Sequence, residues 1–186
     1  MKGGLLVAGI GNVFLSDDGF GVEVVSRLAG ADLPAGVRLM DYGIRGMHLA
    51  YDLAGYEQAI LIDAAPRGEP PGTVYVIEPD LPPAGGSDCV EPAAESVGPF
   101  FDAHGMQPDV VFTMLDQLTD QLTDQRPSRI LVVGCEPATV EYGMGLSEPV
   151  ASAVDEAVRV VLGLIAEQAE QTQPVASDSG PLLAEE

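Results

Sequence analysis

Acidic side chains follow four stretches of mostly apolar sequence, and this spacing could create a cation site. Asp17 and Asp18 come after the first stretch, Asp41 ends the second, Asp63 ends the third, and Glu136 follows the fourth. If the stretches are parallel strands, their carboxyl ends meet at the edge where α/β sheets bind ligands. Carboxylates gathered there repel one another unless a cation or a shared proton intervenes. Any one of them could instead cap a helix, but as a group they favour a cation site.

Histidine is scarce, so an imidazole ligand of such a site has to be His48 or His104. Two aspartates and one histidine would suit a first-row divalent ion and leave coordination positions open for a substrate. His104 follows a long loop and begins an expected helix, so it could face the same crevice as the acids. His48 lies near the start of another expected helix, and a lone histidine more often has a structural role.

The elements that must position these residues are expected to be strands that alternate with helices. Apolar runs without alternation at residues 5–8, 59–62 and 130–133, the last within an expected strand over 129–134, are typical of strands buried on both faces of a parallel sheet. The first of these strands should span residues 2–9, and another is expected at 36–41. Residues 72–77 alternate in polarity, which favours an edge strand and is compatible with an antiparallel orientation.

Helical periodicity separates these strands. We expect helices over residues 20–28, 45–54, 104–122 and 147–168, the first capped by Ser16 or Asp17 and the last by Ser147. Residues 78–101 form a long loop rich in proline, glycine and acid. The pattern predicts one α/β domain over residues 1–168, a three-layer sandwich (phosphorylase/hydrolase-like) with a mostly parallel twisted sheet flanked by helices. Residues 169–186 are expected to be a disordered acidic tail.

Composition excludes several classes of partner. The net charge of −21 would repel nucleic acid and anionic membranes. No apolar run approaches the length of a membrane helix, and no signal-peptide pattern opens the sequence. Cys89 and Cys135 make neither a disulfide framework nor a zinc pattern. We therefore expect a cytoplasmic protein with reduced thiols, no nucleic-acid partner and no membrane contact.

Two other chemistries are poorly supported. The turn over residues 9–12 could cradle a pyrophosphate, but Phe14 replaces the third glycine of the dinucleotide pattern, and Asp17 and Asp18 would repel phosphate. The serine-hydrolase pattern Gly-x-Ser-x-Gly is absent. Cys135 follows a buried strand and could face the crevice, but no histidine lies near it in sequence, so a cysteine protease stays a minor possibility.

Four segments make the chain resemble the hydrogenase maturation proteases over residues 5–166. A glycine turn followed by an acidic pair and a helix, residues 9–21, is similar to the family's signature. Residues 41–47 resemble its second motif, residues 62–64 its third, and residues 134–137 the end of its last core strand. Two positions differ from the family's pattern: its first acid is often Glu where this chain has Asp18, and Tyr42 and Ile44 interrupt the usual Asp-Gly-Gly-Thr.

The resemblance implies an endopeptidase that removes the C-terminal extension from the large-subunit precursor of a nickel–iron hydrogenase. It implies that Asp18, Asp63 and His104 bind nickel, which the precursor supplies, and that Asp41 positions the substrate or handles a proton. The nickel could polarise the scissile carbonyl or only license docking. An alternative is a non-catalytic chaperone that binds the metal or the metallated precursor, and a nucleotide-binding module is a third.

Overall fold

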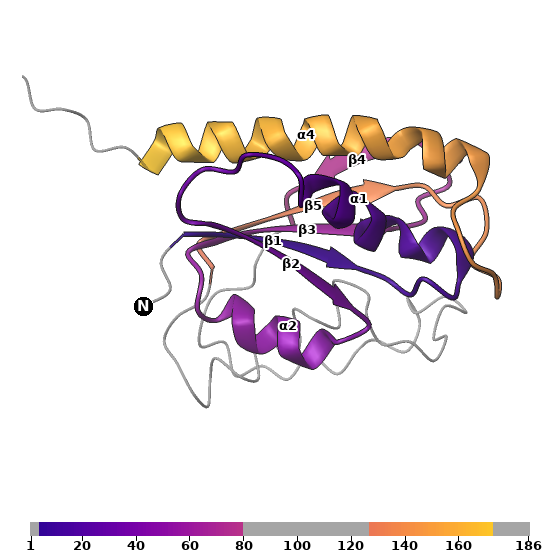
Figure 1. Cartoon of the computed structure of the whole chain (residues 1–186), viewed down its shortest axis with the longest axis horizontal. Helices are drawn as coiled ribbons and strands as arrows, with labels where there is room; N and C mark the ends of the chain where they lie inside the picture. Colours follow the sequence, from indigo (N-terminus) through magenta and orange to yellow (C-terminus); the bar gives the residue numbers. More distant parts are fainter. Residues whose placement is uncertain (1–3, 80–126, 173–186) are drawn as a thin grey trace, which may run out of the picture.

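The computed structural model describes residues 4–79 and 127–172, and the chain over these residues folds around a five-stranded sheet (Figure 1). The strand order is β2-β1-β3-β5-β4. The strands are β1 (Leu5–Ile10), β2 (Val37–Gly43), β3 (Gln58–Ala64), β4 (Val74–Ile77) and β5 (Arg129–Cys135). All neighbours pair in parallel except β4, which pairs with β5 in the antiparallel direction. This confirms the expected mostly parallel sheet and its antiparallel edge.

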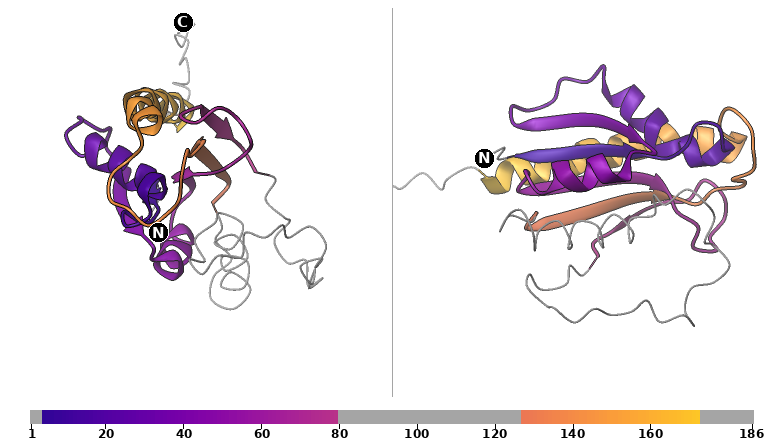
Figure 2. Two further views of the ribbon diagram at one scale, coloured as in Figure 1. Left: turned by 90° about the vertical axis from the view of Figure 1, so that its right-hand side faces the viewer. Right: turned by 90° about the horizontal axis from the view of Figure 1, so that it is seen from below.

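Helices cover both faces of the sheet, as expected for a three-layer sandwich. Helices α1 (Phe20–Leu28) and α4 (Glu148–Thr172) lie on one face, and α2 (Gly46–Leu53) lies on the other (Figures 1 and 2). Successive residues of β1 face opposite sides of the sheet: Val7 packs with α1 and α4, and Leu6 packs with α2. Burial on both faces therefore explains why the central residues of β1, β3 and β5 are apolar without alternation.

Element ends differ from the sequence-based expectation by a few residues. Strand β2 continues two residues past Asp41, and α4 continues to Thr172, so the first four residues of the expected tail are helical. The rest of that tail, the long loop beyond Pro79 and the expected helix beginning at His104 lie outside the described residues. Within the described ranges no helix is both long and apolar enough to cross a membrane.

The start of α1 also differs from the prediction. A short 3₁₀ turn, η1 (Ser16–Gly19), precedes the helix, and Gly19 occupies the cap position without a side-chain capping bond. Neither Ser16 nor Asp17 caps α1, because both side chains bond to a distant segment. The hydroxyl of Ser16 donates to the carbonyl of Glu141, and the carboxylate of Asp17 accepts from residues 138, 139 and 147.

The order of the strands creates a switch point between β1 and β3. After β1 the chain adds β2 on one side, then returns to add β3 on the other side. Connections that leave two neighbouring strands in opposite directions open a crevice beyond their carboxyl ends, and ligands of α/β proteins bind there. In this fold the segment after β1 and the end of β3 lie at that switch point.

Candidate functional site

Asp18 and Asp63 meet at the switch point. Asp18 lies in η1 after β1, and Asp63 is the next-to-last residue of β3. The Asp63 side chain is only 5% exposed. Burial raises its pKa well above the ordinary aspartate value, the negative charge of Asp18 raises it further, and the backbone N–H of Ala64 opposes the shift. The structure thus brings together the two acids that the strand ends predict, in a setting that favours one proton or a cation between them.

Glycine makes this meeting possible. A Cβ atom added at Gly21 would overlap the carbonyl oxygens of Ile62 and Ile10, so the first turn of α1 rests directly on the backbone of β3 and β1. Gly11 has φ +129°, and a Cβ atom there would overlap the carbonyl oxygen of Asp18. Only glycine permits both close approaches. The glycine turn therefore serves to seat η1 above the end of β3, which fits a role other than phosphate binding.

The backbone around Asn12 orients the Asp18 carboxylate. The N–H of Asn12 donates to Oδ2 of Asp18 at 2.7 Å. The side-chain oxygen of Asn12 in turn accepts from the N–H of Phe14 at 3.0 Å, which is the geometry of an Asx turn. Sequence reasoning did not assign Asn12 a role, although an asparagine directly after a glycine turn is the signal that could have found it.

Asp17 has a structural role, in contrast to its neighbour. It is fully buried, and its carboxylate accepts hydrogen bonds from the N–H groups of Ala138, Thr139 and Ser147 and from the Ser147 hydroxyl, at 2.6–3.0 Å. Burial by itself would raise its pKa, but the bonds from Ser147, Thr139 and Ala138 outweigh burial and lower it. Asp17 therefore fixes the β5–α4 segment to η1, and the expectation that it belongs to the cation group is wrong.

Glu136 is likewise occupied in holding a loop. It is buried, and its two carboxylate oxygens accept from the N–H groups of Arg67 at 2.6 Å and Gly68 at 3.1 Å. Cys135 beside it is also buried; burial first, and the charges of Asp17 and Glu136 after it, raise its pKa to about 12. Its thiol stays protonated at neutral pH, so it is a poor nucleophile. The structure thus gives Glu136 a structural role and disfavours the cysteine protease alternative.

Asp41 lies on the outer strand β2, beside Gly9 of β1, and is exposed to solvent. The Arg45 guanidinium donates to the carbonyl oxygens of Asp41 and Tyr42 and so closes the turn after β2. Tyr42 points into the core and donates its hydroxyl to Asp52 at 2.8 Å. The Asp41 side chain is therefore accessible, and of the two motif departures only Ile44 faces solvent.

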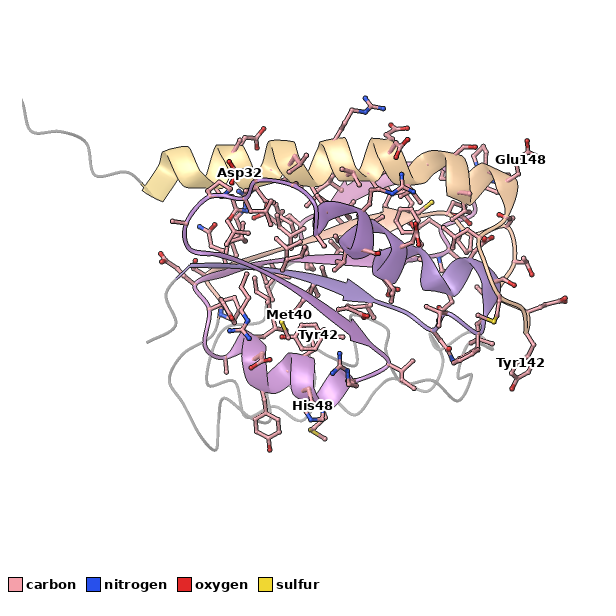
Figure 3. All side chains as sticks on the ribbon, in the orientation of Figure 1. Asp32, Met40, Tyr42, His48, Tyr142 and Glu148 are labelled. Atoms are coloured by element: carbon pink, nitrogen blue, oxygen red, sulfur yellow. The ribbon has the colours of Figure 1, made fainter. Side chains whose placement is uncertain are left out.

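Of the two candidate histidine ligands, the structure describes only His48. His48 is exposed to solvent on α2 (Figure 3), away from the acid pair's strand ends. His104 lies outside the described residues, so the expected third ligand stays a prediction. Within residues 4–79 and 127–172 no three His, Cys, Asp or Glu side chains gather closely enough to hold a metal ion. The described site is therefore an acid pair.

Together the fold and the site define a class: an α/β protein whose switch-point crevice carries paired carboxylates in place of a phosphate-binding turn. Residues 22–87 match the family model described as HycI, hydrogenase maturation protease. The hydrogenase expression/formation protein HupD of Rhodobacter capsulatus is 36% identical over 156 residues, which cover 83% of this chain and 67% of HupD. A putative hydrogenase maturation protease of Methanocaldococcus jannaschii is 32% identical over 88% of this chain and 97% of its own length.

A solved structure gives the same result. The hydrogenase maturating endopeptidase HybD from Escherichia coli superposes with a TM-score of 0.66 at 27% identity, over 89% of this chain and 93% of HybD. The chain belongs to the hydrogenase maturation protease family. It is therefore an endopeptidase of hydrogenase maturation, a hydrolase that acts on peptide bonds.

Proposed function

We propose that this protease removes the C-terminal extension of a nickel-loaded large-subunit precursor of a nickel–iron hydrogenase, and that it recognises the inserted nickel through Asp18, Asp63 and His104. The observation that carries the proposal is the meeting of Asp18 with the buried Asp63 at the switch point. We further propose that the reaction takes place in the cytoplasm, as the family resemblance implies.

The electrostatics of the acid pair support a visiting cation. The pKa of Asp63 is raised first by the cost of burying its charge and then by repulsion from the partly buried carboxylate of Asp18. A divalent ion would relieve both, and binding it would release the proton from Asp63. Two carboxylates and one imidazole suit a first-row divalent ion such as nickel. Because this donor set leaves coordination positions open, the precursor can keep its own ligands on the ion.

The chain's residues then have distinct tasks in the reaction. Asp18 and Asp63 would dock the metallated precursor, and the backbone of Asn12 would hold Asp18 in position. Asp41, which is accessible at the same edge of the sheet, would position the substrate or handle a proton during hydrolysis. Nickel would either polarise the scissile carbonyl as a Lewis acid or only hold the bond in place.

The test is cleavage of purified precursor, with and without nickel. We expect the wild-type protein and the exposed control variant Asp32→Asn to shorten only the nickel-loaded precursor. We expect Asp18→Asn and Asp63→Asn to lower the rate at least about 100-fold, because each removes a charged ligand. Normal cleavage by both variants would refute the assigned roles.

Two further readouts separate the remaining alternatives. Tight binding of the precursor with no change in its mass would indicate the non-catalytic chaperone. Replacing nickel with zinc in the precursor separates the roles of the ion. If the ion only docks the precursor, the zinc-loaded precursor should be cleaved at a similar rate as long as it still binds. If the ion acts as a Lewis acid, the rate of bond cleavage should change with the metal.

A further inference from the structure

Two loops that are far apart in sequence are joined beside the acid pair. The N–H of Ser16 donates to the carbonyl of Gly143 at 2.9 Å, and the N–H of Gly143 donates to the carbonyl of Phe14 at 3.0 Å. Leu15 and Gly143 thereby form an isolated parallel bridge. We refer to residues 13–14 and 140–144 as the apolar loop pair.

The apolar loop pair exposes large apolar side chains to solvent. Phe14 is 62% exposed, Tyr142 88% and Met144 79%. Val13 and Val140 are also exposed, so the pair holds five of the nine large exposed apolar side chains of the described residues. Tyr142 extends from the outer loop at the end of the molecule where the strands finish (Figure 3). Exposed apolar side chains gathered on one surface mark an interaction site.

This surface is connected to Asp18, one of the proposed metal-binding residues, by hydrogen bonds. The N–H of Phe14 donates to the Asn12 side chain, and the N–H of Asn12 donates to the Asp18 carboxylate. On the other loop, Asp17 holds Thr139 and Ser147 on either side of residues 140–144. A partner that reached Asp18 would therefore meet the apolar loop pair, and little ordering of these loops would be needed on binding.

The charges in the two segments that carry the apolar loop pair have a single sign. Residues 12–18 and 138–148 contain Asp17, Asp18, Glu141 and Glu148 and no lysine or arginine. Glu141 and Glu148 are exposed. A complementary surface would present apolar side chains bordered by basic residues. A second copy of this chain, with a net charge of −21, does not meet that requirement.

We propose that the apolar loop pair is the docking surface for the precursor, which presents an apolar segment bordered by lysine or arginine next to its nickel site. This inference rests on the proposed function, since it takes the nickel-loaded precursor as the partner. Phe14 and Tyr142 would anchor the complex, as exposed aromatic residues often do.

The test separates docking from bond cleavage in steady-state kinetics with the nickel-loaded precursor. We expect Phe14→Ser/Tyr142→Ser to raise KM about thirtyfold with kcat within about threefold of wild type, because only binding energy is lost. Tyr51→Ser on α2, also an exposed aromatic substitution (53%), is the matched control and should change KM less than about twofold. An unchanged melting temperature would show that all variants are folded.

A second measurement tests the charge requirement. Raising the salt concentration should raise KM of the wild type, and Glu141→Gln should weaken this dependence. An unchanged KM in the double variant overturns the docking surface while leaving the protease function intact. A wild-type dimer that dissociates in the double variant at unchanged KM would assign the surface to a second copy instead. If wild type fails to cleave the precursor, the function and this inference fall together.

Discussion

Two buried aspartates of this protein, Asp17 and Asp63, have opposite environments. Asp17 accepts four hydrogen bonds from one distant segment, and its pKa is lowered. Asp63 is buried beside a second carboxylate, and its pKa is raised. Burial is common to both, so it is the partners that decide the outcome. Four donors offset burial at Asp17 and make it part of the architecture. At Asp63 burial has the largest influence and the charge of Asp18 adds to it, so Asp63 depends on a proton or a cation.

The two environments distinguish an aspartate that stabilises the fold, Asp17, from one that is a candidate for function, Asp63. A buried carboxylate that accepts enough hydrogen bonds inside the protein stabilises the fold and has no free acceptor positions for a ligand. A buried carboxylate whose charge is not compensated lowers the stability of the free protein and is stabilised when a ligand binds. This compromise between stability and activity is common at active sites. Four predictions test this contrast, from the largest expected effect on the free energy of unfolding or on activity to the smallest.

The largest effect is expected for Asp17→Ala. The substitution leaves the N–H groups of Ala138, Thr139 and Ser147 without their acceptor, so we expect unfolding to require about 3 kcal/mol less. Urea denaturation measures this directly. The exposed Asp32→Ala should change stability by less than about 0.5 kcal/mol. A comparable loss in both variants would contradict the structural role of Asp17.

Asp63→Asn should have the opposite sign. Asparagine has no carboxyl group whose ionisation burial and the charge of Asp18 oppose, so the substitution should stabilise the metal-free protein by about 1 kcal/mol at pH 7. The amide oxygen can still accept from the N–H of Ala64, so no hydrogen bond need be lost. Urea denaturation of the metal-free protein gives the value, and a stability loss above about 1 kcal/mol would show that Asp63 is structural after all.

The pH dependence follows from the same shifts. Because the pKa of Asp63 is raised, the folded state binds its proton more tightly than the unfolded state. Its stabilising contribution is present below about pH 4, the ordinary aspartate range, and is lost as pH rises through the folded-state pKa. The advantage of Asp63→Asn should therefore shrink as pH falls from 7 towards 4.

Asp17 should behave in the reverse manner. Its lowered pKa makes its contribution present above about pH 4 and lost as pH falls through the folded-state value. Denaturation curves at several pH values compare each variant with the wild type.

For Asp63, a difference in stability between the wild type and Asp63→Asn that stays constant from pH 7 to 4 would mean that Asp63 is not the titrating group.

The smallest effect is expected for Asp18→Glu. The substitution keeps the charge and extends it by one methylene, and glutamate often stands at this position in the family. We expect cleavage of the nickel-loaded precursor to stay within about fivefold of wild type. An Asp18→Glu variant as inactive as Asp18→Asn would show that the reach of this side chain, and not only its charge, is essential.

The sequence predicted the framework of the fold and the proximity of Asp18 and Asp63. Apolar strands without alternation indicated a parallel sheet, and the acids at the ends of β1 and β3 indicated their meeting, because both signals depend on local sequence and one topological rule. His104 and the helix expected after it fall outside the described residues, so the third ligand is a prediction still.

Other features depended on contacts that no local pattern encodes. Asp17 and Asp18 are chemically alike and adjacent, and only the bonds from residues 138–147, more than a hundred positions away, distinguish them. Glu136 was expected at the crevice, but its oxygens accept from Arg67 and Gly68 across the sheet edge. The pairing of the loops that carry Phe14 and Tyr142 likewise depends on a long-range contact, the bridge between Leu15 and Gly143.

The contact of Gly21 with the ends of β1 and β3 has a consequence for how this site can evolve. Helix and strands touch there through main-chain atoms, so at this point atomic radii set their smallest separation. Mutations elsewhere in the hydrophobic layers can accumulate without bringing α1 closer to the strand ends than this contact allows. A single methyl group at position 21 would overlap the carbonyl oxygens of Ile62 and Ile10 and push α1 away from the strand ends. The distance between the carboxylates of Asp18 and Asp63 should then increase.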